Sequence, residues 1–302
     1  MIIKSFRREG ESGYCGQDVE SWTERWDNAE DLTELFKKAD KDYLSIFFKK
    51  YFPKPPKRIL EGGCGTGKYV FAYRKMGYDI IGVDFSAETI KRIKDIDGSL
   101  PVYEGDVTKL SFEDQFFDCY FSGGVIEHFE QGPDIVIKEA RRVLKTGGLF
   151  LATVPYVNFL RKVYFNMRSI SEKKGILQKN YNDCKLDEVS PDKYRFCEYF
   201  FDVASLKPYF EKNGFTIEKT FPMNFIWGEV GKPLHKYIHM FKTSKSSSGS
   251  NSANKEKDKH IIKDLAKDFL IIENRNNMFF RYPLTFINYL SGNMVLIAAK
   301  AV

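Results

Sequence analysis

Residues 58–67, Arg-Ile-Leu-Glu-Gly-Gly-Cys-Gly-Thr-Gly, join a short apolar run to three alternating glycines. The apolar run predicts a strand, and the glycines allow a tight turn into a helix that begins near Lys68. The N-terminus of that helix would offer free N–H groups and a partial positive charge. The stretch therefore predicts a strand–turn–helix unit that binds a ligand at its turn, and a turn without a ligand is the alternative.

The same alternation of apolar runs and helical segments continues after this unit. Short apolar runs at residues 79–84, 100–104, 117–122 and 149–154 alternate with helical segments, and further strands are expected at 215–221 and 294–299. Apolar strands separated by helices are typical of a parallel sheet that is covered on both faces. We therefore expect an α/β fold with a doubly wound, mostly parallel, seven-stranded sheet and helices on both faces.

The chain of 302 residues is expected to divide into this core, an N-terminal segment and two insertions. Residues 1–56 predict an N-terminal helical lid, residues 57–155 the core, and residues 198–221 a core helix and strand. Two insertions are expected, an aromatic and basic one at 156–197 and a basic one at 222–285 with a flexible loop at 244–254. Residues 286–302 carry the final core strand.

Composition limits the class of protein. With 43% hydrophobic residues a large core can form, and the net charge of +6 is modest. Residues 222–283 hold 11 Lys and Arg against 6 Asp and Glu, so contact with phosphates or a membrane surface is one interpretation and a solvated surface the other. Five cysteines without a C-x-x-C pair predict reduced thiols, no metal centre and a cytoplasmic protein.

Acidic residues follow three successive predicted strands. Glu61 ends the first, Asp84 the second, and Asp106 lies just after the third. Doubly wound sheets bind their ligands at this carboxyl edge, and a carboxylate such as Asp84 can accept from both hydroxyls of a ribose. Each acid alone could be an ordinary surface residue, but three at one edge predict a nucleoside site.

The glycine spacing separates two cofactor classes. A dinucleotide site favours G-x-G-x-x-G, but starting from Gly63 the last position of that pattern is Lys68. The spacing acidic-x-G-x-G-x-G instead resembles the first motif of class I S-adenosylmethionine-dependent methyltransferases, of the small-molecule type 11 (UbiE-like) superfamily. The resemblance covers roughly residues 58–220.

The resemblance implies S-adenosylmethionine as cofactor and S-adenosylhomocysteine as product. It places the acidic residue of the motif near the methionine ammonium, the glycines beneath methionine and ribose, and Asp106 at the adenine amine. The cofactor-binding residues that we expect are Glu61, Gly63, Cys64, Gly65, Gly67, Asp84, Phe85, Asp106, Val107, Ser122 and Gly123.

Residues 121–129, Phe-Ser-Gly-Gly-Val-Ile-Glu-His-Phe, resemble the segment that lines the sulfonium pocket in many such enzymes. His128 is a candidate general base, because histidine titrates near neutral pH, and Glu127 a candidate for orienting it. The alternative is that both residues only brace the next helix. Ser-Gly-Gly replaces the Asn/Asp-Pro-Pro-aromatic motif of amide-methylating relatives, so DNA is not an expected partner.

The acceptor side is less well defined. Tyr156, Tyr194 and Arg195 are candidate substrate residues, and Trp22 and Trp26 can either close over the cofactor as a lid or pack on the core. The expected reaction is O- or N-methylation of a small or amphiphilic acceptor, such as a sugar, a lipid or quinone headgroup or a secondary metabolite. The alternatives are an RNA methyltransferase, a dehydrogenase and a cofactor-binding scaffold without catalysis.

Overall fold

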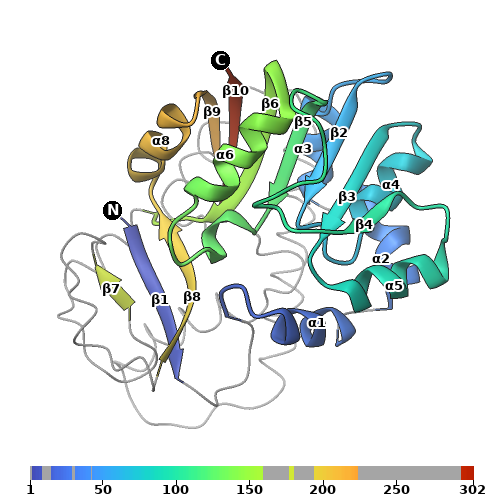
Figure 1. Ribbon diagram of the computed structural model, residues 1–302, viewed down its shortest axis with the longest axis horizontal. Helices are drawn as coiled ribbons and strands as arrows, with labels where there is room; N and C mark the ends of the chain where they lie inside the picture. The colour runs from blue at the N-terminus through green and yellow to red at the C-terminus, as the bar shows by residue number, and fades with distance from the viewer. Residues whose placement is uncertain are drawn as a thin grey trace, which may run out of the picture.

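A seven-stranded sheet forms the core of the computed structural model, which describes residues 2–8, 15–28, 31–41, 43–158, 177–179, 194–223 and 294–302. The strand order is β4-β3-β2-β5-β6-β10-β9, and only β10 runs antiparallel to its neighbours (Figure 1). The strands are β2 (Arg58–Gly62), β3 (Asp79–Asp84), β4 (Val102–Glu104), β5 (Phe117–Gly123), β6 (Leu144–Pro155), β9 (Phe215–Met223) and β10 (Met294–Ala301). The predicted fold class is confirmed.

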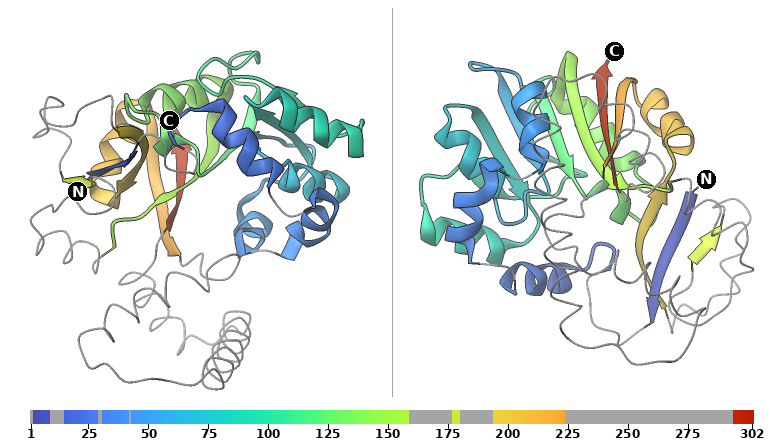
Figure 2. Two further views of the ribbon diagram at one scale, coloured as in Figure 1. Left: turned by 90° about the horizontal axis from the view of Figure 1, so that it is seen from below. Right: turned by 180° about the vertical axis from the view of Figure 1, so that it is seen from behind.

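Helices cover both faces of this sheet (Figures 1 and 2). One face packs on the apolar sides of α2 (Leu32–Lys38), α3 (Tyr43–Tyr51), α4 (Lys68–Lys75) and α5 (Ala87–Ile96). The other face packs on α6 (Asp134–Val143) and α8 (Val203–Lys212). Buried aromatic rings fill both layers, with Phe48 against Phe121 on one side and Phe150 against Phe210 on the other. These two layers fix the carboxyl ends of the parallel strands at one edge.

A second, three-stranded antiparallel sheet was not expected from the sequence. Its order is β7 (Leu177–Lys179), β1 (Ile2–Arg8), β8 (Tyr194–Phe201). The segment 1–56 is therefore not purely helical, because its first element is a strand that pairs with residues about 190 positions later in the chain. Tyr156, just after β6, forms a bridge with Phe201 and so connects the two sheets.

The two remaining elements lie near the carboxyl edge of the large sheet. They are α1 (Val19–Asp27) and a short 3-10 helix, η2 (Ile126–His128); another 3-10 turn, η1 (Ala39–Lys41), links α2 to α3. In Figure 1, α1 lies across the lower edge of the sheet. Among the described residues, no helix is long and apolar enough to cross a membrane.

The prediction of reduced thiols is wrong for two of the cysteines. Cys15 and Cys197 form a disulfide, while Cys64 and Cys119 are buried free thiols. An odd cysteine count and wide spacing could not reveal a pair that lies 182 residues apart in sequence. Most of the 156–197 and 222–285 insertions, including Cys184 and the predicted 244–254 loop, lies outside the described residues.

Candidate cofactor site at the carboxyl edge

The glycine turn after β2 has the backbone that its sequence predicted. Gly63, Gly65 and Gly67 have φ angles of +74°, +49° and +67°, which side chains with a Cβ rarely adopt. A Cβ at Gly63 would collide with Val125. The amides of Gly63 and Cys64 both donate to the Val83 carbonyl, at 2.8 and 3.0 Å, so the turn is fixed against the end of β3.

Asp84 joins this turn to the next one. Its carboxylate accepts from the Gly65 amide at 2.7 Å and from the Ser86 amide at 3.1 Å. Asp84 is only 3% exposed, and this burial raises its pKa although the two amides act in the opposite direction. Each carboxylate oxygen has a second lone pair, so the side chain can still accept from a ribose diol. Glu61, on β2, is also buried.

The other predicted cofactor residues lie along the same edge. Phe85 is half-buried directly after β3. Asp106 is exposed beyond β4, where its Oδ1 accepts from the Thr108 amide at 2.8 Å, and its neighbour Val107 is buried. The exposed Asp106 carboxylate faces solvent at the position where the resemblance predicts the adenine amine.

Ser122 and Gly123 end β5 beside the glycine turn. Ser122 is completely buried, and its hydroxyl has no hydrogen-bond partner among the residues that the structure describes. A buried hydroxyl without a partner is uncommon in native proteins, because its desolvation is not repaid. Together with the glycine backbone and Asp84, this hydroxyl fits a site that receives a polar ligand.

His128 is held by the backbone of β8 rather than by Glu127. Its Nδ1 lies 2.8 Å from the carbonyl of Cys197, and the ring is 8% exposed. Burial lowers the pKa of His128 to about 4, with a smaller contribution in the same direction from Arg25. The imidazole is therefore neutral at pH 7, and it is a weaker base than the sequence suggested.

Helix α1 covers this edge with its two tryptophans. The Trp26 ring lies so close to Gly65 that a Cβ there would be 2.9 Å from Cζ2. The Trp22 ring meets His128 edge-on, with 4.8 Å between centroids, and its Nε1 donates to the Gly16 carbonyl at 2.9 Å. The tryptophans therefore contact the carboxyl edge as well as each other.

Several polar contacts that the sequence gave no reason to expect hold α1 in place. The hydroxyls of Thr23 and Ser86 are 2.7 Å apart, and Asp27 forms an ion pair with Arg92 of α5. Arg195 of β8 binds Asp18 at 3.2 Å, next to the Cys15–Cys197 disulfide. Of the three candidate substrate residues, Arg195 is therefore paired with the residue before α1. Tyr156 is buried where β6 meets β8, and the Tyr194 side chain lies outside the described residues.

Comparisons with known proteins agree with this geometry. A family model described as "Methyltransferase domain" matches residues 60–152. An uncharacterized protein of Methanocaldococcus jannaschii is 32% identical over 48% of this chain and 65% of its own length. The demethylmenaquinone methyltransferase of Streptomyces avermitilis is 30% identical over 41% of this chain and 53% of its own length. The chain therefore spans 65% of the length of the Methanocaldococcus relative and 53% of the length of the Streptomyces relative.

A solved structure shares the fold over most of both chains. A Haloferax volcanii methyltransferase, solved in complex with the Trm112 methyltransferase activator, has a TM-score of 0.52 at 13% identity, covering 94% of this chain and 97% of that one. Residues 60–152 thus match a methyltransferase domain, and the sheet that they help to build has the fold of the Haloferax structure.

Proposed function

We propose that this chain transfers a methyl group from S-adenosylmethionine to a small or amphiphilic acceptor, by direct in-line displacement at oxygen or nitrogen. The observation that carries this proposal is the closure of α1 over the glycine turn, with Trp26 on Gly65 and Trp22 on His128. A covered site excludes water and suits a small acceptor group better than a long duplex.

The chain's own residues would position the reactants, since the cofactor's sulfonium supplies an already activated methyl group. In this proposal the glycine turn carries the methionine and ribose, Asp84 binds the ribose hydroxyls and Asp106 binds the adenine amine. Alignment of two bound reactants is a large source of rate acceleration. Access for the cofactor requires α1 to shift, because Trp26 covers Gly65.

The environment of His128 narrows the acceptor chemistry. An imidazole with a pKa of about 4 retains a proton poorly at pH 7, so it helps little with an ordinary alcohol. A carboxylate, a free amine or an acidic hydroxyl needs less assistance from a base. The Streptomyces relative is named for demethylmenaquinone, which supports a quinone headgroup among the acceptors. Tyr156 and Arg195 remain candidate acceptor-side residues.

Transfer of a labelled methyl group tests this proposal. Purified protein would be incubated with S-adenosylmethionine labelled in its methyl group and with panels of carboxylate, amine, phenol and quinol acceptors, with D84N as the inactive control. We expect label in at least one class with wild type and none with D84N. Label that appears in RNA, and in no small acceptor, would instead favour the RNA methyltransferase.

Two rival functions and two cellular features remain to be tested. The basic segment 222–285 is the reason for considering an RNA methyltransferase. The same segment is our candidate for phosphate or membrane contact. Most of it lies outside the described residues. A cofactor-binding scaffold would bind the cofactor and transfer nothing to any acceptor. A cytoplasmic location stays a proposal, and the Cys15–Cys197 disulfide counts against it because disulfides are most common in oxidising compartments.

A further inference from the structure

Helix η2 and strand β8 bring three potential metal ligands together. One ligand atom from each of Glu127, His128 and Glu198 lies within 4.8 Å of the other two. Two of these residues are adjacent in sequence, whereas Glu198 comes from the unexpected second sheet. The group therefore exists only because β8 packs against η2.

Glu127 is the most deeply buried member of this group. The side chain is 1% exposed, and its Oε2 has no hydrogen-bond partner within the described parts of the chain. Burial raises the pKa of Glu127 well above its usual value, and the nearby Glu198 adds to the effect. A buried carboxylate beside a second one is costly unless a proton neutralises it or a cation compensates the charge.

His128 is oriented as metal-binding histidines usually are. Because the Cys197 carbonyl can only accept, Nδ1 carries the ring hydrogen and Nε2 keeps its lone pair. Imidazole ligands of metals commonly donate their other N–H to a backbone carbonyl, which fixes the tautomer and the ring orientation. Burial keeps this ring neutral, which is the form that binds a metal.

Two cationic side chains lie on the neighbouring elements α1 and β1. Arg25 of α1 lies over the rings of Trp22 and Trp26, and its charge contributes to the low pKa of His128. Lys4 of β1 is buried over the rings of Phe196 and Tyr199. Compensation of the two carboxylates by these side chains is the competing explanation, and it predicts that no metal binds.

We propose that Glu127, His128 and Glu198 bind one divalent cation of the Mn²⁺ or Mg²⁺ class beside the methyl-transfer edge, contrary to our expectation from the sequence of no metal. Two carboxylate oxygens and one imidazole nitrogen form a mixed donor set that suits Mn²⁺. Three protein ligands leave positions for water or for an oxygen of the acceptor.

The role of this ion rests on the proposed function, although its binding does not. An acceptor hydroxyl bound at an open position would have its pKa lowered by the metal, and its proton would pass to water before the oxygen takes the methyl group. The lower pKa of the hydroxyl would remove the need for a general base, because His128 binds a proton too weakly to serve as one. The acceptor class then becomes a molecule with a hydroxyl or carboxylate oxygen that can reach the ion.

Titration of the full-length, EDTA-treated protein with Mn²⁺ tests the site, with free Mn²⁺ followed by electron paramagnetic resonance. We expect one ion per chain in wild type and at least tenfold weaker binding in E198Q. The matched control is E130Q, which removes an equal charge from an exposed residue just beyond η2 and should bind like wild type. Circular dichroism checks that both variants are folded.

A second measurement needs no variant. Pulsed electron paramagnetic resonance of Mn²⁺ on the wild-type protein should show ¹⁴N modulation from the imidazole of His128. Absence of binding, absence of ¹⁴N modulation, or equal loss in E198Q and E130Q would overturn the site. S-adenosylhomocysteine binding in EDTA is scored separately, so that a failed metal site and a failed methyltransferase assignment can be distinguished.

Discussion

Asp84 is the residue on which the cofactor site most depends. It accepts hydrogen bonds from the Gly65 and Ser86 amides, and so holds the glycine turn against the start of α5. The same carboxylate is the acceptor that we assign to the ribose hydroxyls. Substitution by Asn keeps the shape and one acceptor oxygen, but it removes the charge and turns an NH2 group toward one of the two amides, so binding is compared in folded D84N protein.

We predict that Asp84→Asn weakens S-adenosylhomocysteine binding by about 2 kcal/mol or more, which is roughly 30-fold, through the loss of charge-assisted hydrogen bonds. Isothermal titration calorimetry measures the effect. Asp95→Asn, an exposed residue on α5, should bind like wild type. Wild-type affinity in a folded D84N protein would remove Asp84 from the site.

The buried His128 should make stability depend on pH. Its folded pKa of about 4 lies below the ordinary value of 6.5, so the unfolded chain takes up a proton between pH 6.5 and 4 that the folded chain does not. Stability from this residue is therefore present above pH 6.5 and lost as the pH falls toward 4.

The predicted loss is roughly 3 kcal/mol, from about 1.4 kcal/mol per unit of pKa. Urea unfolding of wild type and His128→Gln at pH 7 and pH 4, both in EDTA, measures it. The stability advantage of wild type over the variant should shrink by this amount at pH 4. Because Glu127 titrates in both proteins, it largely cancels in the difference. An advantage that is independent of pH would contradict the burial of a neutral His128.

For single residues, the sequence predicted backbone conformation better than it predicted the surroundings of a side chain. The glycine spacing at Gly63, Gly65 and Gly67 required positive φ angles, and the structure has them. The low pKa of His128 was not predictable, because it arises from burial, with Trp22 against the ring, and from the charge of Arg25, and both residues are distant in sequence. The grouping of Glu127 with Glu198 was missed for the same reason.

Among the elements, α1 is fixed at its N-terminal side by a covalent bond. The Cys15–Cys197 disulfide connects the residues before α1 to β8, and the Gly16 amide donates to the Cys197 carbonyl at 2.9 Å. Trp22 and Thr23 add single contacts to the edge of the sheet. Without the covalent link, α1 would be held by these weaker contacts and by the ion pairs of Asp27 with Arg92 and of Asp18 with Arg195.

Loss of this disulfide should therefore loosen α1 specifically. In Cys15→Ser we predict that backbone amides of Val19–Asp27 exchange hydrogen at least tenfold faster, while amides of β5 and β6 change little. Cys197→Ser and the double variant should give the same acceleration, because each breaks one bond. Hydrogen–deuterium exchange with mass spectrometry measures this. If the increase in exchange rate in the double variant equalled the sum of the increases in the two single variants, the Cys15–Cys197 disulfide would be contradicted.

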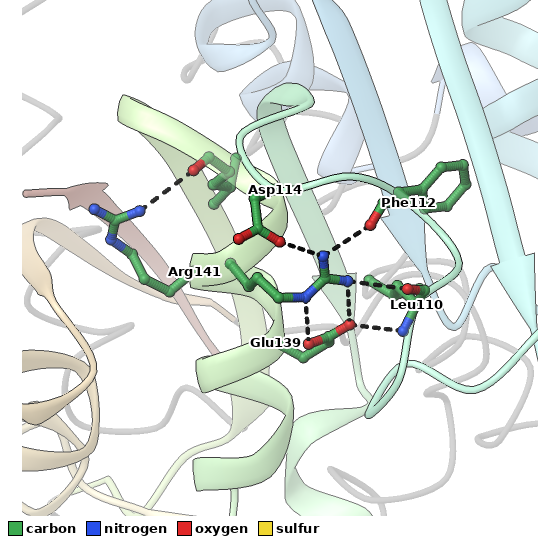
Figure 3. Close-up of polar contacts among 7 residues, drawn as sticks. Leu110, Phe112, Asp114, Glu139 and Arg141 are labelled. Carbon is green, nitrogen blue, oxygen red and sulfur yellow. Dashed lines mark hydrogen bonds and ion pairs between the residues drawn. The ribbon is translucent and has the colours of Figure 1, made fainter.

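Helix α6 is fixed to the loop before β5 by one guanidinium group (Figure 3). Arg142 donates to the carbonyls of Leu110 and Phe112 at 2.9 and 2.8 Å, and it pairs with Asp114 and Glu139. Glu139 in turn accepts from the Leu110 amide at 2.7 Å. The contacts with Arg142 and this amide keep the pKa of Glu139 below its usual value in spite of partial burial.

We predict that Arg142→Ala lowers the free energy of unfolding by roughly 2–3 kcal/mol, because it leaves two carbonyls and Glu139 without their donor. Lys138→Ala, on an exposed position of the same helix, should change it by less than about 0.5 kcal/mol. Urea denaturation compares the two variants. Equal effects would mean that the network contributes little.

Elements with strong periodicity were predictable, and those that depend on distant partners were not. The strands at 58–62, 79–84 and 117–123 and the helices between them follow directly from apolar runs and glycine stops. By contrast β1 and β8 have mixed polar sequences, Ile-Ile-Lys-Ser-Phe-Arg-Arg and Tyr-Arg-Phe-Cys-Glu-Tyr-Phe-Phe, and pair across most of the chain. Such long-range pairing has no local signal.

The whole molecule combines a methyltransferase core with a second sheet and a covering helix. The core carries the proposed cofactor site at the carboxyl edge, β8 supplies Glu198 and the carbonyl that orients His128, and α1 lies over the glycine turn and His128. This arrangement explains why the core was predictable from one motif. The acceptor was not, because the elements beside this edge, β1, β8 and α1, depend on pairing between distant parts of the chain.

The most direct test of this account is a calorimetric titration of the full chain with S-adenosylhomocysteine, with NAD as the parallel control. We predict micromolar binding of S-adenosylhomocysteine and none of NAD, accompanied by a change in tryptophan fluorescence as α1 adjusts over the glycine turn. Binding of NAD, or of neither compound, would contradict the assignment of the carboxyl edge as an S-adenosylmethionine site.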